Sequence, residues 1–282
     1  MRFAVLNGRA HLVSPDGRSL VDVNAASNGA LPAAANSCFA EWNALREFAS
    51  SNTHFDIPLD ERQLDAPSPD ARQVFGIGLN YRSHAEESSM DIPTSPLTFP
   101  KFPSSITSPH GDVVLSGPLV DFEAEVVAVI SAGGRNITEA NAWNHVAGIC
   151  PGQDISDRGL QFASNPPQFG LGKSRETFSP FGPWLVSPDE LANKDALVVS
   201  CALNGEEMQR ASTDDLIFSI PATIEYLSSI VELYPGDVIF TGTPGGIGAT
   251  RKPPRFLASG DVLTTTIDGI ATITNRIVAR AS

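Results

Sequence analysis

The sequence has few cysteines, and their spacing excludes two common kinds of structural site. Cys38, Cys150 and Cys201 are the three cysteines of the 282-residue chain, and each lies far from the other two. Zinc sites built from cysteine need closely spaced pairs such as CxxC, and a disulfide framework needs several pairs in a short chain. We therefore expect neither, and a reducing, cytoplasmic setting fits this cysteine usage.

The chain is also poor in basic residues. It holds 19 Lys and Arg against 32 Asp and Glu, which gives a formal net charge of −13. The basic residues form no cluster along the sequence, whereas nucleic-acid surfaces depend on basic patches. We therefore expect no nucleic-acid partner, and we interpret the acidity as favouring solubility.

Long apolar runs are missing as well. No stretch approaches the roughly 20 apolar residues that a membrane-spanning helix needs. The opening MRFAVLNGRAHLV has no extended apolar core followed by a small-residue cleavage site. We expect neither membrane association nor a signal peptide.

The length and the pattern of strand-like runs predict a β-rich α+β protein. A chain of this length fits one large domain or one large domain with a smaller one. Residues 1–70 are interpreted as a small N-terminal domain that ends in a Pro-rich linker at 64–72, and residues 71–282 as the main domain. The main domain is mostly short strands with few helices.

Local signals within the main domain predict several elements. Asn204-Gly205 between two strand-like runs at 195–211 predicts a hairpin. Apolar residues at helical spacing after Ser219 predict a capped helix from residue 220 to 231. Residues 138–149 are predicted as a helix, and the proline-dotted residues 91–111 as a loop.

The stretch DFEAEVVAVI at 121–130 combines a strand pattern with acids. Its second half is apolar on both faces, which predicts a strand buried on both sides. Glu123 and Glu125 point to the same face about 6.5–7 Å apart along the strand. Either one of them takes a proton or a cation lies between them, unless this is an exposed edge strand with solvated acids. With Asp154 as a third acid, the site would suit Mg²⁺, Mn²⁺ or Ca²⁺.

Two further segments could contribute to a site. His84 and Glu87 would share a helix face, where the carboxylate would orient the imidazole for general-base work, although an ordinary polar helix face also fits. Lys173 lies among glycines and aromatics in FGLGKSRETFSPFGP, either reaching into a pocket or serving as a loop cation. The Gly-rich TGTPGGIG at 241–248 lacks the GK[ST] of a phosphate-binding loop.

Six stretches in this order resemble the fumarylacetoacetate hydrolase family over roughly residues 70–278. They are GLNYRSHAEE, DFEAEVVAVI, QDISDRGLQ, GKSRETFSPFGPWLV, LNGEEMQ and YPGDVIFTGTPGGIG. The resemblance implies a mixed β-sandwich roll, usually a homodimer. The order of six matches makes it highly specific.

The resemblance also implies roles for particular residues. It implies a metal set of Glu123, Glu125 and Asp154, a water-activating pair of His84 and Glu87, and carbonyl contacts from Gln161 and Lys173. Three more residues match substrate-binding positions: Arg158, Thr243 and, near the pocket entrance, Lys101. This chain departs from many members in having Gln153 before the metal Asp, and Asp157 and Gly159 around the Arg.

The activity that the resemblance implies is metal-dependent hydrolysis of a C–C bond in a 2,4-dioxo acid of acylpyruvate type or a related β-diketone. The alternative is an oxaloacetate decarboxylase or an isomerase of unsaturated dicarboxylates on the same fold. A metal-binding protein without turnover is the alternative from another class. The sequence does not name the acyl group.

Overall fold

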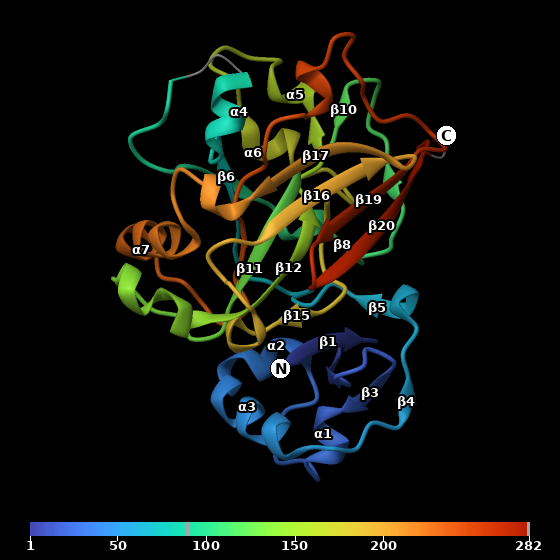
Figure 1. The fold of residues 1–282 in the computed structure, drawn as a ribbon, viewed down its shortest axis with the longest axis vertical. Helices are drawn as coiled ribbons and strands as arrows, with labels where there is room; N and C mark the ends of the chain where they lie inside the picture. The colour runs from blue at the N-terminus through green and yellow to red at the C-terminus, as the bar shows by residue number, and fades with distance from the viewer. Residues whose placement is uncertain (88–90, 281–282) are drawn as a thin grey trace.

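The computed structural model describes residues 1–87 and 91–280, and two β-sheets dominate it, which confirms the β-rich α+β class (Figure 1). The larger sheet has eleven strands in the order β4-β3-β2-β1-β15-β12-β11-β18-β6-β7, with β5 paired to β1. Its strands are β1 (Arg2–Leu6), β2 (Arg9–Val13), β3 (Ser19–Asp22), β4 (Ile57–Pro58), β5 (Leu64–Asp65), β6 (Val74–Gly78), β7 (Leu97–Lys101), β11 (Ala124–Ile130), β12 (Val146–Gln153), β15 (Leu185–Val186) and β18 (Val238–Phe240).

The second sheet has five strands in the order β17-β16-β19-β20-β9. These are β9 (Val113–Val114), β16 (Val198–Leu203), β17 (Glu206–Ser212), β19 (Val262–Ile267) and β20 (Ala271–Val278), and two short pairs stand apart, β10 (Val120–Asp121) with β13 (Ser156–Asp157) and β8 (Ile106–Thr107) with β14 (Ser179–Pro180). The predicted hairpin is confirmed, since β16 and β17 join at Asn204 and Gly205 with φ of +54° and +85°. Two positive φ values are what a tight two-residue hairpin turn requires.

The helices are short and lie around the sheets. They are α1 (Val23–Ala26), α2 (Ala35–Ala40), α3 (Trp42–Ser51), α4 (Arg82–Glu87), α5 (Arg158–Gln161), α6 (Phe169–Gly172) and α7 (Ile220–Ile230), with 3₁₀ turns η1 (Glu61–Gln63), η2 (Pro103–Ser105), η3 (Glu139–His145), η4 (Pro188–Glu190), η5 (Thr213–Asp215) and η6 (Gly248–Thr250). α7 begins as predicted, because the Ser219 hydroxyl accepts the Ala222 N–H at 3.1 Å. Within the described residues, no helix is both long and apolar enough to cross a bilayer.

β11 lies between two apolar clusters, which confirms the strand buried on both sides. Val126 and Ala128 pack in the cluster that includes Val199 of the smaller sheet. Val127 and Val129 face the other way, into a cluster with residues of the N-terminal segment. All seven residues of β11 are buried. The acids at its start therefore sit at the edge of a dry interior.

Two local predictions were wrong. Residues 138–149 are helical only in η3, and the following run VAGICPGQ is the fully buried strand β12. Pairing with β11 along seven register positions overrides the helical spacing of this short segment.

Residues 91–111 include β7, which pairs with β6 at the end of the large sheet. Pro100 is tolerated there because an edge strand leaves one row of backbone groups unpaired.

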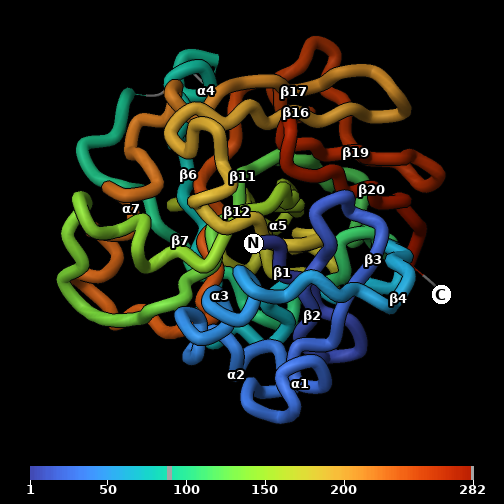
Figure 2. Tube along the Cα trace, turned by 60° about the horizontal axis from the view of Figure 1, so that its bottom comes forward, coloured from blue at the N-terminus to red at the C-terminus, as the bar shows by residue number. Residues whose placement is uncertain are grey.

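The N-terminal strands continue the large sheet. β1 pairs antiparallel with β15, with Phe3 opposite Leu185. Phe39 and Trp42 share an apolar cluster with Val129 of β11. Figures 1 and 2 both place α1 and α2 at the opposite end of the molecule from α4 and β17. The domain boundary at residue 70 stays a prediction.

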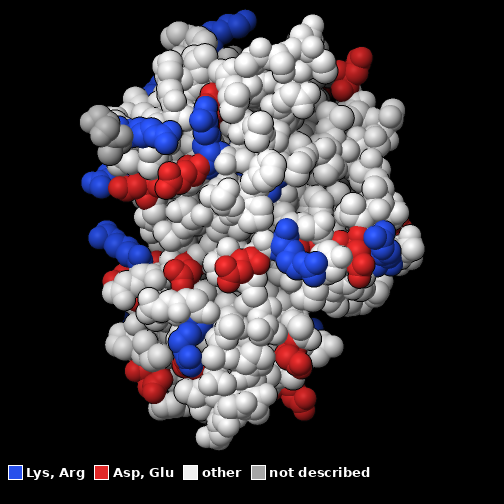
Figure 3. All heavy atoms as spheres, turned by 180° about the vertical axis from the view of Figure 1, so that it is seen from behind, with Lys and Arg blue, Asp and Glu red and all other residues white. Residues whose placement is uncertain are grey.

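The surface carries charges of both signs. Figure 3 shows Lys and Arg interspersed with Asp and Glu on the face opposite to that of Figure 1. Several exposed pairs are in contact, such as Arg210 with Asp268 at 2.5 Å and Arg276 with Asp112 at 3.0 Å. The face drawn in Figure 3 presents no continuous basic patch.

Candidate functional site

Three acids meet where β11 begins and β12 ends. The register places Ala124 opposite Gln153, and the Asp154 N–H donates to the Glu123 carbonyl at 2.9 Å. One carboxylate oxygen from each of Glu123, Glu125 and Asp154 lies within 4.8 Å of the others, and all three residues are buried. The structure thus brings together the three acids of the expected metal set.

Glu125 is the acid without a cationic partner among the described residues. Its carboxylate accepts the Gly242 N–H at 2.7 Å, while no Lys, Arg or His of the described ranges 1–87 and 91–280 lies within ion-pair distance. Burial raises the pKa of Glu125 well above its usual range, and the charges of Asp154 and Glu123 raise it further. Three crowded carboxylates, one of them without a cationic partner and with no Cys in their cluster among the described residues, fit a hard divalent cation that prefers oxygen ligands.

Two buried lysines form ion pairs with the acids of this cluster. Lys173 Nζ lies 2.7 Å from both Glu123 Oε2 and Asp154 Oδ2. Burial opposes its charge, yet the attraction of Asp154 and Glu123 leaves the pKa of Lys173 raised. Lys101 pairs with Asp154 and donates to the Lys173 carbonyl at 2.5 Å. Its position differs from the expected pocket entrance, because Lys101 is 1% exposed and lies beneath the acids.

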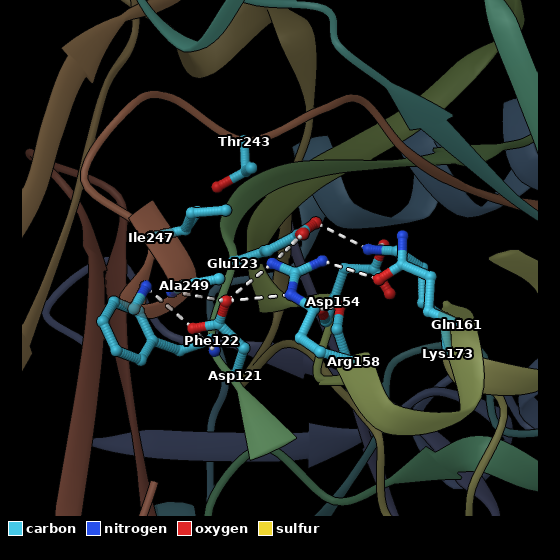
Figure 4. A network of polar contacts seen from close by, with 12 residues as sticks. Asp121, Phe122, Glu123, Asp154, Arg158, Gln161, Lys173, Thr243, Ile247 and Ala249 are labelled. Atoms are coloured by element: carbon cyan, nitrogen blue, oxygen red, sulfur yellow. Dashed lines mark hydrogen bonds and ion pairs between the residues drawn. The ribbon is translucent and has the colours of Figure 1, made fainter. Parts of the chain in front are cut away.

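A second network joins Arg158 to the start of the acidic stretch (Figure 4). Arg158 Nε donates to Asp121 at 2.9 Å, Nη1 donates to Gln161 at 2.9 Å, and Nη2 lies 2.7 Å from Glu123. Asp121 also accepts the N–H groups of Gly248 at 2.8 Å and Ala249 at 3.1 Å. One buried carboxylate therefore fixes both Arg158 and the loop after β18.

Asp121 was not among the residues singled out from the sequence. The available signal was an acid between Val120 and Phe122, both fully buried here. An acid enclosed in apolar sequence must be paired or hydrogen-bonded once buried. The partner Arg158 lies 37 positions away, so the sequence could indicate the need but not the partner.

The loop carrying Thr243 is tied to the acidic strand. The Thr243 hydroxyl donates to the Ala124 carbonyl at 3.0 Å and accepts from Gln209 Nε2 at 2.8 Å. Gln209 was also missed, although it ends the LNGEEMQ stretch. Gly242 has φ of +110°, and a Cβ there would lie 2.6 Å from Cβ of Asn80. Glycine at this position lets the backbone N–H reach Glu125.

His84 and Glu87 lie on α4, within the short helix expected over 81–90, and residues 88–90 of that prediction lie outside the described residues. His84 Nδ1 lies 3.8 Å from Glu87 Oε2, longer than a hydrogen bond, and it has no partner among the described residues. Glu87 accepts the Gly246 N–H at 2.9 Å. Burial lowers the pKa of His84, so the ring is neutral near pH 7.

A cavity of about 290 Å³ connects these groups. Its polar lining residues are His84, Glu123, Arg158, Gln161, Lys173, Thr243 and Thr250. Its other walls are mainly apolar and include Phe99, Phe162, Phe169 and Ile247. A more open hollow of about 430 Å³ beside β16 and β17 contains none of the predicted site residues. A small ligand with acidic oxygens would thus meet His84, the two cations Arg158 and Lys173, and Glu123 in one space, while Glu125 and Asp154 lie outside its lining.

Comparison with known proteins identifies the family. The family model "Fumarylacetoacetate (FAA) hydrolase C-terminal" matches residues 73–278. The human mitochondrial oxaloacetate tautomerase FAHD2A is 39% identical over 224 residues, which cover 79% of this chain and 71% of the relative. The mitochondrial oxaloacetate tautomerase fahd2 of Xenopus laevis is 36% identical over 276 residues, covering 96% of this chain and 86% of the relative.

Solved structures show the same fold. A putative HpcE protein from Mycobacterium smegmatis matches with a TM-score of 0.93 and 46% identity, covering 100% of both chains. Maleylpyruvate hydrolase from Sphingobium sp. SYK-6, solved in complex with manganese(II) ion and pyruvate, matches with a TM-score of 0.82 and 26% identity over 100% of both chains. The fold, the acids and the family model agree, and the chain belongs to the fumarylacetoacetate hydrolase family.

Proposed function

We propose that this protein is a divalent-metal-dependent enzyme that interconverts the keto and enol forms of a small 2-oxo acid. The observation that carries the proposal is the position of His84, a buried neutral base that shares one cavity with Glu123, Arg158 and Lys173. Oxaloacetate tautomerases among the relatives support this reaction class. One proton-transfer group facing a charged oxygen-binding end is the minimum that such a reaction needs.

Glu123, Glu125 and Asp154 are the residues that would hold the ion, Mg²⁺ or alternatively Mn²⁺ or Ca²⁺. When bound, a divalent ion supplies a Lewis acid that draws negative charge onto the substrate's oxygens. Manganese in the structure of the maleylpyruvate hydrolase relative supports a divalent ion of this class.

The protein's own groups would handle the proton. The neutral ring of His84 takes a proton from the carbon next to the 2-oxo group, and the electrons of that C–H bond form the C=C bond. The oxygen gains a proton and His84 returns its own to solvent, so protons balance. Lys173 and Gln161 hold the oxygen end as charge develops there, and Arg158 keeps Gln161 in place through its 2.9 Å hydrogen bond.

Hydrolysis of a C–C bond in a 2,4-dioxo acid of acylpyruvate type is the second candidate. The 3.8 Å approach of Glu87 to His84 favours it, because a carboxylate beside the ring would orient the ring for taking a proton from water. The hydroxide would add to the distal carbonyl, the C–C bond would break, and the pyruvate-like fragment would leave as an enolate that takes up a proton. Oxaloacetate decarboxylation through the same enolate is a further outcome of this site.

The test is turnover by the Mg²⁺- or Mn²⁺-loaded protein, with keto–enol exchange and products followed by NMR for oxaloacetate, a branched 2-oxo acid and an acylpyruvate. His84→Ala should lower kcat by about 10²–10⁴-fold, while metal affinity stays unchanged because His84 is outside the acid set. The matched control His54→Ala changes an exposed histidine whose side chain is 78% accessible. Normal enol exchange in His84→Ala would show that the base is another group. Cleavage of the acylpyruvate without enol exchange would favour the hydrolase.

The homodimer that the family resemblance implies remains a prediction. A homodimer would appear as a doubled mass in light scattering. The cytoplasmic setting expected from the sequence also stays a prediction, since several relatives are described as mitochondrial.

A further inference from the structure

The cavity has two chemically different ends. Its deep end carries Glu123, Arg158 and Lys173, each at most 8% exposed. Its outer part reaches Phe162, a phenylalanine that is 58% exposed. The walls between are formed by Phe99, Pro167, Phe169 and Ile247. A bound 2-oxo acid with its oxygens at the acids would therefore direct its other end along an apolar surface.

The basic groups of the cavity are already engaged by acids. Lys173 lies 2.7 Å from Glu123 and from Asp154. Arg158 lies 2.8–2.9 Å from Asp121, which is not one of the three acids proposed to hold an ion. Metal binding would therefore leave the pair of Arg158 and Asp121 in place. Lys173 differs, because both of its acidic partners belong to the set proposed to hold the ion, and the proposed function places Lys173 at the 2-oxo end of the substrate. A second carboxylate at the far end would find no further uncommitted Lys or Arg among the described lining residues.

A second hollow, whose lining includes the polar residues Ser95 and Thr98, adjoins the aromatic wall of the cavity. Phe99 and Phe169 meet edge to face with ring centroids 5.7 Å apart. The second hollow, of about 520 Å³, lies behind this pair, shares both rings and is also lined by Leu97 and Tyr226. Phe99 sits directly over Gly76, where a Cβ would lie 2.3 Å from the ring. The glycine in β6 thus makes room for one of the two rings that separate the hollows.

We infer that the substrate of this protein has a single carboxylate, at its 2-oxo end, and an apolar group at its distal end. This inference rests on the proposed function and names the substrate class for the same site. Each methylene buried against such walls strengthens binding by about fourfold. A carboxylate placed there would lose its hydration without gaining a partner and would lie in a cavity that already contains Glu123.

A matched pair of ligands tests the inference. Oxaloacetate and 4-methyl-2-oxopentanoate have the same 2-oxo end, and they differ in carrying a carboxylate or an isopropyl group of similar shape at the other. With the Mg²⁺-loaded protein, we expect calorimetry to give about tenfold or greater preference for 4-methyl-2-oxopentanoate. Equal or tighter binding of oxaloacetate would overturn the inference. The stated preference without any enol exchange would uphold it and overturn the proposed function alone.

Substitutions in the apolar wall test whether its side chains cause the preference for 4-methyl-2-oxopentanoate. Phe169→Ala should weaken binding of 4-methyl-2-oxopentanoate by about tenfold, because it removes contact area, and should change oxaloacetate affinity by less than about fourfold, the effect of one buried methylene. Phe102→Ala is the matched control, since this phenylalanine is 51% exposed and does not line the cavity. Phe162→Arg adds a cation at the rim and should shift the preference toward oxaloacetate. Equal losses for both ligands in Phe169→Ala would contradict the assignment.

Discussion

The N-terminal segment and the acid site place their charges in opposite ways. Within residues 1–70, all of which are described, no Asp, Glu, Lys or Arg is buried, and His11 is the one buried histidine. The interior there is aromatic, with the rings of Phe3, Phe39 and Trp42 at centroid distances of 5.3–5.4 Å. At the acid site, by contrast, Lys101 and Asp154 have fully buried side chains in contact with each other.

The difference shows which region stabilises the fold and which serves chemistry. Burial of aromatic rings contributes directly to the free energy of folding. Burial of ion pairs contributes little or nothing net, because desolvation offsets the attraction. The site alone encloses four acids and three basic residues, Asp121, Glu123, Glu125 and Asp154 with Lys101, Arg158 and Lys173. We attribute their burial to the proposed function rather than to stability. Substitutions in the two regions should therefore have separable effects.

Phe39→Ala should give the largest difference between an effect on stability and an effect on metal affinity. Removing a 1% exposed ring should lower the free energy of unfolding by about 3–5 kcal/mol, measured by urea denaturation. Metal affinity of the folded fraction should not change, since the ring is remote from the acids. Phe102→Ala should stay within about 0.5 kcal/mol. A parallel loss of metal affinity in Phe39→Ala would break the comparison.

Glu125→Gln should have the opposite effect to Phe39→Ala: it should abolish metal binding while keeping the folded structure. The raised pKa of Glu125 means that the folded protein holds a proton that the unfolded chain releases above its ordinary value of 4.5. Metal-free wild type therefore loses stability as pH rises above that value, and the variant should lack this loss. Mg²⁺ at 100 times its Kd should stabilise wild type by about 2.7 kcal/mol and the variant not at all. Thermal melts with and without Mg²⁺ measure both effects.

The exposed acid Glu206, changed to Gln, is the control for this substitution. It should keep the wild-type dependence on both pH and Mg²⁺. A stabilising response to Mg²⁺ in Glu125→Gln would remove Glu125 from the ion's ligands.

Asp121→Asn tests whether a buried acid can act through another residue. It should weaken the hold on Arg158 and on the N–H groups of Gly248 and Ala249, and so lower kcat/KM by about 10–100-fold. We expect the loss mainly in kcat with metal affinity nearly unchanged, which a purely structural defect would not produce. Asp112→Asn, at an exposed ion pair with Arg276, serves as the control. Unchanged kinetics would exclude a positioning role.

The smallest expected effect concerns the pH profile. Because burial lowers the pKa of His84, kcat/KM should fall on the acid side only below pH 6.5, the ordinary value for histidine. The charge of Glu87 raises the pKa of His84, so Glu87→Gln should move this limb to lower pH. Asp56→Asn, beside the exposed His54, should leave the limb in place. An acid limb that stays fixed in Glu87→Gln would separate the two residues functionally.

Several parts of this structure could be predicted because their causes are local. The alternation around Glu123 and Glu125 predicted a strand buried on both sides, since two apolar faces cannot both meet water. Asn204-Gly205 predicted its hairpin because both positions need positive φ. Ser219 predicted the start of α7 because its hydroxyl satisfies a free N–H at the helix end.

Other parts depended on contacts between distant segments. VAGIC has apolar spacing that fits either a helix or a strand, and the pairing with β11 decides for the strand. Three contacts depend on segments that are far apart in sequence. They are the ion pair of Lys101 with Asp154, the hydrogen bond of Arg158 to Asp121, and the hydrogen bond of Gln209 to Thr243. The apolar walls of the cavity also come from separate loops, which periodicity does not place.

The sequence by itself determined that two glutamates would enter a dry interior and would need compensation there. Local periodicity and the cost of burying charge are enough for that conclusion. The tertiary structure alone decided what surrounds them: a third acid across the sheet, lysines behind, Arg158 fixed by Asp121, and aromatic walls at the far end of the cavity. The physical reason is that hydrogen bonds and ion pairs act over a few ångströms in space, whatever the separation along the chain.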